Sequence, residues 1–412
     1  MSLKPSQYRW LIALSGTLCV FACIGLGRLA IGMLLPSMSA ALDLSYAQMG
    51  QLSSLNFVGY LLAVVFAGGL INRLGYRTTI FAALIIISLS IMAIGFARQY
   101  ISVLIFYTLT GIGSGFANIA IMALIPNWFA TNIRGRATGL AVIGNGLAMS
   151  LAGKVIPFLN NMYPADGWRF SWFLISGIIF GVSAFCLIVI RNSPDEGRKK
   201  PEETRTKRVK AEVSKTTFSP ALKREMIKLA LVYFLFGFTH VVYLTFIVTA
   251  LVSEWGFAET IAGDFWAIVG IISLISGPFF GWISDKSNRQ ISMSLVFLIQ
   301  AISYVLIALK LPGMGLFASI GLFGLVCWAI PGIMTAIVGD IVGPKHTARF
   351  FGYVTFAFSI GQIAGPAMAG YLAELTNSFS SGFYMTSVLA GLAVVISLFV
   401  KSSNPPFSRD NK

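Results

Sequence analysis

Long apolar stretches alternate with short polar segments along the whole chain. A membrane core about 30 Å thick is crossed by a helix of about 20 residues, and each stretch reaches that length. The pattern therefore predicts an all-α membrane protein with 12 transmembrane helices. The stretches fall at residues 10–35, 46–71, 78–97, 101–126, 137–159 and 169–190, and then at 227–252, 260–283, 291–309, 313–338, 350–373 and 380–400.

One long polar segment, residues 191–228, separates the first six stretches from the last six. It carries 12 Lys or Arg and 6 Asp or Glu residues, and such low hydrophobicity with high charge is typical of a linker. We therefore predict two six-helix bundles, residues 1–190 and 223–412, joined by a basic cytoplasmic linker at 191–222.

The positive charges are distributed unevenly between the two sides that the helices define. Of the 30 Lys and Arg residues, 25 fall in the ends of the chain and in alternate loops. Cytoplasmic loops of membrane proteins are enriched in Lys and Arg, so both termini are predicted to lie in the cytoplasm. The remaining five basic residues are Arg98, Arg169 and Lys310 in the opposite loops and Arg28 and Lys154 within apolar stretches.

Composition narrows the class further. Hydrophobic residues make up 56% of the chain and charged residues 11%, against about 25% charged in soluble domains. The net charge of +15 follows from the loop bias, so we expect no nucleic-acid partner. The four cysteines lie in apolar stretches without ligand spacing, and no hydrolase, nucleotide or metal motif occurs, so we expect no enzymatic activity, cofactor or metal.

The two halves repeat each other at a fixed offset. A glycine-rich basic loop, GGLINRLGYR from Gly68, follows the second stretch, and GWISDKSNR from Gly281 follows the eighth, 213 residues later. Arg136 and Arg349, which open the fifth and eleventh stretches, are also 213 residues apart. Two independent motifs at one offset indicate an internal duplication, which is typical of secondary transporters with a substrate site between the repeats.

The loop after the second stretch resembles the signature G-x-L-A-D-R-x-G-R of the major facilitator superfamily (MFS). The N-terminal copy departs from it with Asn72 in place of Asp, whereas the C-terminal copy keeps Asp285. Arg28 followed by Pro36 resembles the anion:cation symporter and organophosphate antiporter branches, in which an Arg at this place faces an anionic substrate. The PNWF motif from Pro126 looks similar to the same loop of organic-anion permeases.

The resemblance also implies a cytoplasmic gate. Charged residues where the cytoplasmic helix ends meet form a latch in this family, although the same cations could serve topology alone. The predicted gate residues are Arg73, Arg77, Arg136, Asp285, Lys286 and Arg349.

Arg28 is the strongest candidate for contact with a substrate. An ionisable residue inside a membrane span is costly and commonly functional. Gly25 and Gly32 share its face of an α-helix, and we expect these small neighbours to leave room for a ligand to reach the guanidinium. Alternatively, the glycines pack against another helix, and Arg28 snorkels or pairs with Asp264.

Other polar residues within the apolar stretches complete the predicted substrate site. Asn56 and Tyr60 lie on one helical face, and His240, which could titrate near neutral pH, shares a face with Tyr243. Hydrogen bonding between helices explains such residues about equally well. The predicted substrate-binding set is Arg28, Asn56, Tyr60, Asn118, His240, Tyr243, Trp328 and Gln362.

The sequence favours a secondary transporter for a small organic anion, moved by alternating access with proton coupling or by exchange. Arg28 and Lys154 have no carboxylate near the membrane midplane, and an unpaired buried cation recruits an anion. We expect a monomer in a bacterial inner membrane, whose partners are the lipid bilayer and the solute. The alternatives are an exporter of apolar or drug-like compounds with Arg28 in a structural role, and a membrane sensor, which would need an output domain.

The charge distribution predicts a testable topology. Reporter fusions after Arg191 and Lys401 should be active on the cytoplasmic side, and fusions near Asp43 and Asp166 on the opposite side. Complementary enzyme reporters that work on only one side of the membrane measure this. An inverted result in one half alone would contradict the arrangement of 12 helices.

Overall fold

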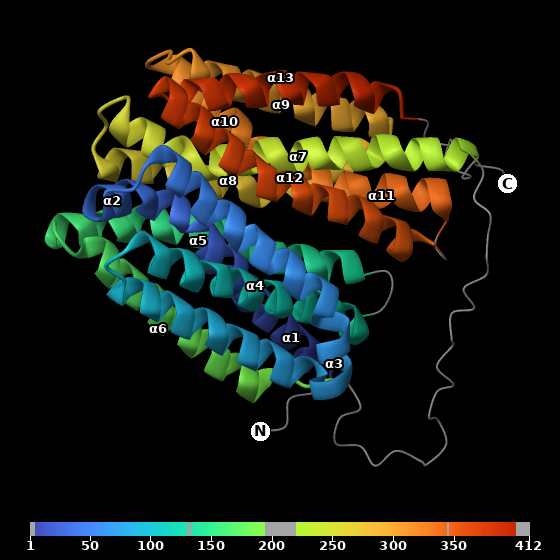
Figure 1. Cartoon of the computed structure of the whole chain (residues 1–412). Coiled ribbons are helices and arrows are strands. Elements are labelled where there is room, and N and C mark those ends of the chain that lie inside the picture. Colours follow the sequence, from blue (N-terminus) through green and yellow to red (C-terminus); the bar gives the residue numbers. More distant parts are fainter. Residues whose placement is uncertain (1–4, 130–132, 194–219, 344–345, 401–412) are drawn as a thin grey trace, which may run out of the picture.

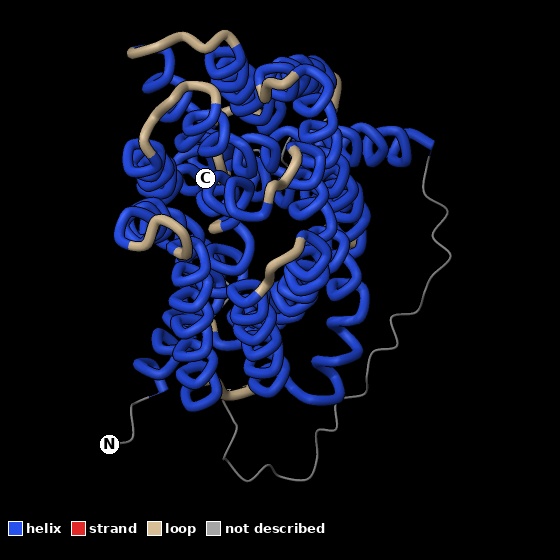
Figure 2. Tube along the Cα trace, turned by 60° about the vertical axis from the view of Figure 1, so that its left-hand side comes forward, coloured by secondary structure: helices blue, strands red, loops and turns tan. Residues whose placement is uncertain are grey.

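The computed structural model describes residues 5–129, 133–193, 220–343 and 346–400 (Figure 1). Within these ranges the chain consists of helices and short loops, as Figure 2 shows, so the predicted all-α fold class is confirmed. Most of the predicted linker lies outside the described residues.

The N-terminal half contains seven helical elements, because its first span is built from three consecutive pieces. They are α1 (Pro5–Val20), η1 (Phe21–Leu29), α2 (Ile31–Leu42), α3 (Tyr46–Phe96), α4 (Tyr100–Trp128), α5 (Arg134–Met162) and α6 (Gly167–Val189).

The described part of the C-terminal half also contains seven, because its fourth span is divided in two. They are α7 (Pro220–Ser253), α8 (Glu259–Lys286), α9 (Arg289–Ala308), α10 (Met314–Val326), α11 (Ala329–Val342), α12 (Thr347–Thr376) and α13 (Ser380–Leu398). Helix α7 begins three residues before the predicted start of this bundle.

Ten segments of the described chain are long and apolar enough to cross a membrane. One of them, α3, has 51 residues, which at 1.5 Å per residue is about two and a half times the thickness of a bilayer core. It is interrupted at Gly75, whose positive φ of 77° no helix allows, so α3 contains the second and third predicted spans. Helix α12 has 30 residues and coincides with the eleventh predicted span. The count of 12 spans stays a prediction with which this arrangement agrees.

The two halves form separate bundles that meet along three pairs of helices. Helix α5 packs on α8, α3 on α12, and α2 on α7. At one end of the molecule, called here the linker end, α1 begins beside the end of α6, where the Tyr8 hydroxyl donates to the Val189 carbonyl oxygen (2.5 Å). Helix α7 begins and α13 ends at this same end, on the right of Figure 1.

The bundles touch at the opposite, far end and separate toward the linker end (Figure 1). A Cβ atom added to Gly50 of α3 would lie 2.3 Å from the Pro366 carbonyl oxygen of α12. On the same two helices nearer the linker end, Gly68, Gly69 and Gly352 would meet nothing within 4 Å. The protein is therefore closed at the far end and open at the linker end.

The distribution of buried apolar residues agrees with this asymmetry. The larger cluster runs through the N-terminal half and continues into the far ends of the C-terminal helices, including Phe246 and Phe379. The smaller cluster, with Tyr233 and Phe297, lies within the C-terminal half. Apolar burial thus joins the halves at the far end.

The α5–α8 contact generates a stability prediction. Gly153→Val would place a Cβ atom 2.4 Å from the Gly263 carbonyl oxygen, and overpacking of this kind costs about 1–3 kcal/mol. We expect a lower melting temperature of the detergent-solubilised protein, measured by differential scanning fluorimetry. Gly177→Val on α6 is the matched control, because a Cβ atom there meets nothing within 4 Å. Equal melting temperatures of the two variants would contradict the close helix contact.

Candidate functional site

Arg28 lies in a π-helical segment, η1, in the middle of the first span. The wider turn appears in the bond from the Ala30 amide to the Gly25 carbonyl oxygen, five residues back (3.2 Å). Such segments are rare and occur frequently at functional sites. The π-helical turn was not predicted from the sequence, because π and α turns have the same hydrophobic requirements over so short a distance.

The expected role of the neighbouring glycines was wrong. A Cβ atom on Gly25 would lie 2.2 Å from the Ala148 side chain of α5, and one on Gly32 would lie 2.4 Å from the Leu244 carbonyl oxygen of α7. Both glycines therefore let helices approach closely and do not open a space at the guanidinium. They help to fix the position of η1 between the two bundles.

The Arg28 side chain is enclosed by residues of α3. Its Nε donates to the Asn56 Oδ1 atom (3.1 Å), and its guanidinium carbon lies 4.2 Å from the ring centroids of both Phe57 and Tyr60. Only 8% of Arg28 is exposed. Aromatic faces attract a cation, especially where water is excluded, so both rings stabilise the buried charge.

A second set of hydrogen bonds holds this arrangement from α4. The Asn56 Nδ2 donates to the Tyr107 carbonyl oxygen (2.8 Å), and the Tyr107 hydroxyl donates to the carbonyl oxygen of Arg28 (2.9 Å). The Asn118 Nδ2 donates to the Tyr60 hydroxyl (2.8 Å). The fold thus brings together Arg28, Asn56, Tyr60 and Asn118, four members of the predicted set, from three different spans.

Arg28 carries a charge that no carboxylate of the described residues neutralises. Its electrostatic neighbours are the phenols of Tyr60 and Tyr107 and the thiol of Cys23. Its Nη2 is buried, with no hydrogen-bond partner in the described part of the chain. The alternative in which Asp264 pairs with Arg28 is wrong, because Asp264 accepts from Lys154 at 2.5 Å.

An aromatic group on the C-terminal half contains two further members of the predicted set. The His240 ring lies 4.8 Å from Phe236, 5.6 Å from Phe323 and 5.2 Å from Trp328, measured between centroids. Neither ring nitrogen of His240 has a hydrogen-bond partner among the described residues. The Nε1 of Trp328 also has none there. These polar atoms are therefore buried beside aromatic rings without a hydrogen-bond partner in the described part of the chain.

The span that carries Trp328 is discontinuous at that residue. Helix α10 ends at Val326 and α11 begins at Ala329, and the freed Trp328 amide donates to the Ser276 Oγ atom (3.1 Å). Transporters commonly build substrate sites from broken helices. Sequence reasoning missed this break, although Pro331, within the first turn of α11, is a residue that favours a helix start.

The last two predicted substrate residues lie in different surroundings. Tyr243 is buried within the C-terminal half, where its ring stacks on Phe323 (3.9 Å) and its hydroxyl shares a hydrogen bond with Ser319 (3.1 Å). Gln362 on α12 is 9% exposed. The structure therefore places Tyr243 between α7 and α10, and Gln362 on a helix that contacts the other half.

The predicted gate residues of the N-terminal half lie at the linker end. Arg73 and Arg136 are exposed. Arg77 donates from Nε to the Leu187 carbonyl oxygen at the end of α6 (2.6 Å), and its backbone amide donates to Asn192 (3.0 Å). Arg77 thus ties the loop at Gly75 to its own bundle.

The C-terminal gate residues make a similar local set of contacts. Asp285 accepts from Arg289 (3.1 Å), which also pairs with Asp340 at the end of α11. Lys286 and Arg349 lie over aromatic rings, 4.5 Å and 5.9 Å from the centroids. These contacts lie within one half, which agrees with the separation of the bundles at this end.

At the far end, polar contacts connect the two halves in a group that we call the far-end seam. In each contact a carboxylate of the C-terminal half accepts from a donor of the N-terminal half. The contacts are Lys154 Nζ to Asp264 Oδ1 (2.5 Å), Asn160 Nδ2 to Glu259 Oε2 (2.6 Å) and the Ala47 amide to Glu374 Oε2 (3.2 Å).

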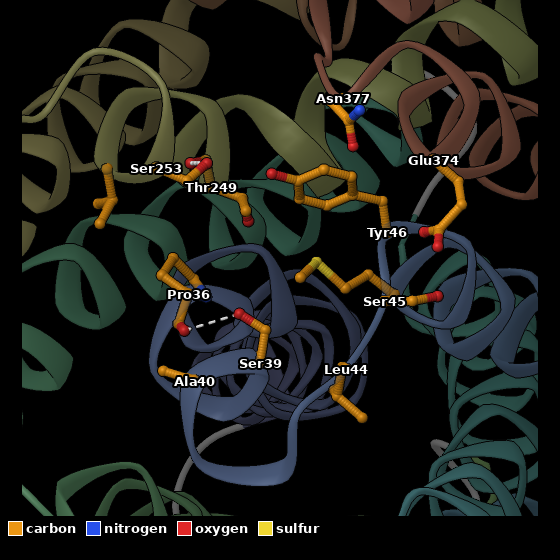
Figure 3. Close-up of a pocket in the computed structure, with 12 residues that line it drawn as sticks. Pro36, Ser39, Ala40, Leu44, Ser45, Tyr46, Thr249, Ser253, Glu374 and Asn377 are labelled. Atoms are coloured by element: carbon orange, nitrogen blue, oxygen red, sulfur yellow. Dashed lines mark hydrogen bonds between the residues drawn. The ribbon is translucent and has the colours of Figure 1, made fainter.

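A cavity of about 490 Å³ lies beside this seam, between α2 and α3 on one side and α7 and α12 on the other. Figure 3 shows the Tyr46 ring between Thr249 and Asn377, and Ser39 hydrogen-bonded to the Pro36 carbonyl oxygen (2.8 Å). The cavity is lined mainly by small polar and apolar groups, with Glu374 as its one acidic side chain.

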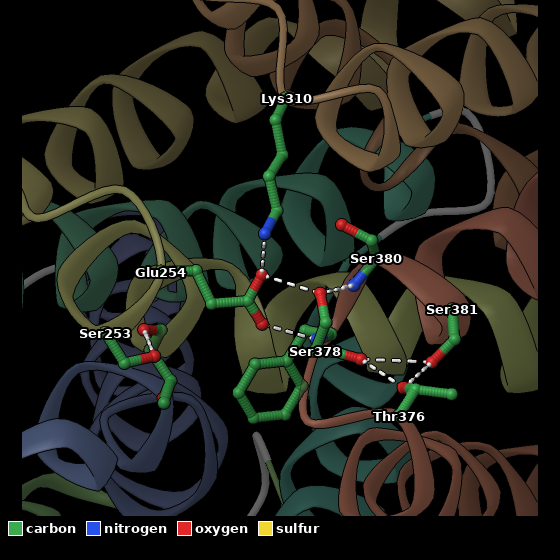
Figure 4. A network of polar contacts seen from close by, with 9 residues as sticks. Ser253, Glu254, Lys310, Thr376, Ser378, Ser380 and Ser381 are labelled. Atoms are coloured by element: carbon green, nitrogen blue, oxygen red, sulfur yellow. Dashed lines mark hydrogen bonds and ion pairs between the residues drawn. The ribbon is translucent and has the colours of Figure 1, made fainter.

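Glu254, another acid at the far end, has a structural role. It pairs with Lys310 (2.8 Å), accepts from the Ser378 hydroxyl (2.9 Å) and accepts from the Phe379 amide (Figure 4). These contacts join three loops of the C-terminal half, so Glu254 belongs to the framework on which the seam is mounted.

Comparison with known proteins decides the family. The sequence profile of the family described as "Uncharacterised MFS-type transporter YbfB" matches residues 20–402. The chain belongs to this MFS transporter family. The predicted superfamily is thereby confirmed, and the chain is a multi-pass membrane transporter of small solutes and not an enzyme.

Individual relatives of this MFS transporter cover nearly its whole length. It is 27% identical to the hexuronate transporter of Bacillus subtilis, over 91% of this chain and 90% of that protein. It is 22% identical to the 4-hydroxybenzoate transporter PcaK of Acinetobacter baylyi, over 96% and 92%. A bacterial homologue of the human lysosomal transporter Spinster, solved in an inward-facing and unoccupied conformation, superposes with a TM-score of 0.77 at 17% identity, over 97% and 98%. That likeness shows the fold.

Proposed function

We propose that this transporter moves a small organic anion, recognised through a carboxylate, and that Arg28 binds that carboxylate. The observation that carries the proposal is the buried guanidinium without an acidic partner among the described residues. Such a charge is costly in a membrane, and a bound anion removes that cost. The names of two relatives support it, since hexuronate and 4-hydroxybenzoate are both carboxylates.

The neutral groups of the C-terminal half are suited to the other part of such a solute. His240 and Trp328 offer unpartnered ring nitrogens next to aromatic surfaces. In this proposal Arg28 fixes the carboxylate, and the aromatic group selects the remainder of the solute.

Transport follows from alternation between two states of the same bundles. We place the linker end in the cytoplasm, because the basic residues gather there. The structure then corresponds to an inward-open state in which the far-end seam and the glycine contacts close the outside. Opening to the outside requires the seam to separate and the linker end to close, driven by a proton or anion gradient.

The central test is a substitution of Arg28. We expect Arg28→Ala to lower the affinity for carboxylates at least about 30-fold, because truncating one partner of a buried, hydrogen-bonded charge pair costs about 2–5 kcal/mol. Arg28→Lys should restore little, since a point charge cannot reproduce the two-pronged contact. The measurement is ligand-dependent stabilisation of purified protein across a panel of carboxylates, phosphates and amines.

Arg98→Ala is the matched control, because it removes an exposed Arg in a far-end loop. Both variants should purify as folded, monodisperse protein. Unchanged carboxylate affinity in folded Arg28→Ala would overturn the anion-site proposal, as would a wild-type protein that binds only amines.

The far-end seam gives a second test, of alternating access. Lys154→Asp places like charges opposite each other across α5 and α8 and should open the far end more often. The reporter is Thr249→Cys, a 1% exposed position beside the cavity, labelled with a membrane-impermeant maleimide in intact cells. All four native cysteines are buried, which keeps the background low.

We expect labelling to rise only a few-fold, because the pair is half exposed and such pairs contribute about 0–1 kcal/mol. The double variant Lys154→Asp/Asp264→Lys should return labelling to the starting level. Asp166→Lys is the control, since Asp166 pairs with Arg169 within the N-terminal half. Equal labelling in the single variant Lys154→Asp and in the double variant Lys154→Asp/Asp264→Lys would exclude a gating role for this ion pair.

A further inference from the structure

The amide of Asn56 is held in one orientation. It is 1% exposed, and its Oδ1 accepts from Arg28 Nε while its Nδ2 donates to the Tyr107 carbonyl oxygen. Because Nε can only donate and a carbonyl can only accept, the reversed amide would lose both bonds. The Oδ1 of Asn56 is therefore a fixed acceptor for the Nε of Arg28.

This fixed acceptor decides which part of the guanidinium remains available. The Nε is occupied by Asn56, and the rings of Phe57 and Tyr60 each have their centroid 4.2 Å from the guanidinium carbon. What remains is the in-plane terminal edge, on which Nη2 has no partner among the described residues. Two parallel N–H groups in one plane match the two oxygens of a carboxylate.

The chemical identity of Asn56 also leaves the charge of Arg28 available. An aspartate has the same size and would accept from the same Nε, but it would bring a negative charge within about 3 Å of the guanidinium. Two opposite charges at that distance in a desolvated site form an ion pair. The guanidinium would then be neutralised from within the protein, and an incoming anion would meet a carboxylate.

We propose that Asn56 is the specificity-determining residue of the site: as a neutral acceptor it positions Arg28 through Nε and reserves the terminal edge and the positive charge for the carboxylate of the solute. This inference rests on the proposed function, since it presumes that Arg28 binds an anion. It assigns to Asn56 a role in distinguishing charged from uncharged solutes, beyond that of a helix contact.

The experiment compares acids with their own amides. Two matched pairs, glucuronate with glucuronamide and benzoate with benzamide, differ in charge while keeping the shape of the rest of the molecule. Dissociation constants are measured by titration of purified protein in detergent, and the readout is the ratio of amide to acid constants. A purely structural role of Asn56 would change both constants together and leave the ratio unchanged.

For the wild type we expect a clear preference for at least one acid over its amide. Asn56→Asp should reduce that preference at least about tenfold, the effect of losing roughly one charged contact. Asn56→Ser, which adds no charge, should weaken binding but keep the preference within about threefold of the wild type. Asn288→Asp at the exposed N-cap of α9 is the matched control, because it adds the same charge far from Arg28 and keeps the cap.

The outcomes separate this inference from the proposed function. If the wild type prefers neither acid, the proposed function fails. A second combination of results would show that the inference about Asn56 alone is wrong. In that combination the wild type prefers an acid, Arg28→Ala abolishes the preference, and folded Asn56→Asp retains it. Should Asn56→Asp not fold, Asn56→Glu adds the same charge in its place: retained acid preference in folded Asn56→Glu would overturn the inference, and its loss there beside retention in Asn56→Ser would support it.

Discussion

The site depends on one constraint, a guanidinium buried in the middle of a membrane protein with no acid among the described residues to neutralise it. A charge in that place is tolerated only where the surroundings compensate it. Two aromatic faces and one amide oxygen supply part of this compensation for Arg28. They are neutral, so none of them cancels the charge itself. The π-helical turn and the bonds from Tyr107 hold the side chain where these groups converge.

The contact between the two halves at the far end combines close packing with exposed polar pairs. Glycine contacts and apolar packing close the far end, while the polar contacts added there are partly exposed to solvent. Exposed ion pairs are weak, so they can define a closed state without making it permanent. The gate residues at the linker end make contacts within their own bundles, as expected when that end is open.

Several features of the candidate site followed from the sequence. Arg28 was recognisable because a charge within an apolar stretch is costly and therefore commonly functional. Asn56 and Tyr60 were recognisable because a spacing of four residues places both on one helical face. The interpretation of Gly25 and Gly32 failed, because a small residue makes room equally for a ligand and for another helix. The suggested pairing of Arg28 with Asp264 failed for a related reason: which cation an acid meets depends on which helices are neighbours, and α5 brings Lys154 there.

The sequence by itself determined the helical spans, the repeat of 213 residues, the basic side and the superfamily. These properties are local or periodic, since each span must satisfy its backbone in lipid and present about 20 apolar residues. Only the tertiary structure decided the π-helical register at Arg28, the break at Trp328, the seam partners and the end at which the bundles separate. Neighbouring turn types differ little in energy, and the balance between them is set by contacts with residues far away in the sequence. The function proposed for Arg28 therefore rests on a residue visible in the sequence and on surroundings that only folding assembles.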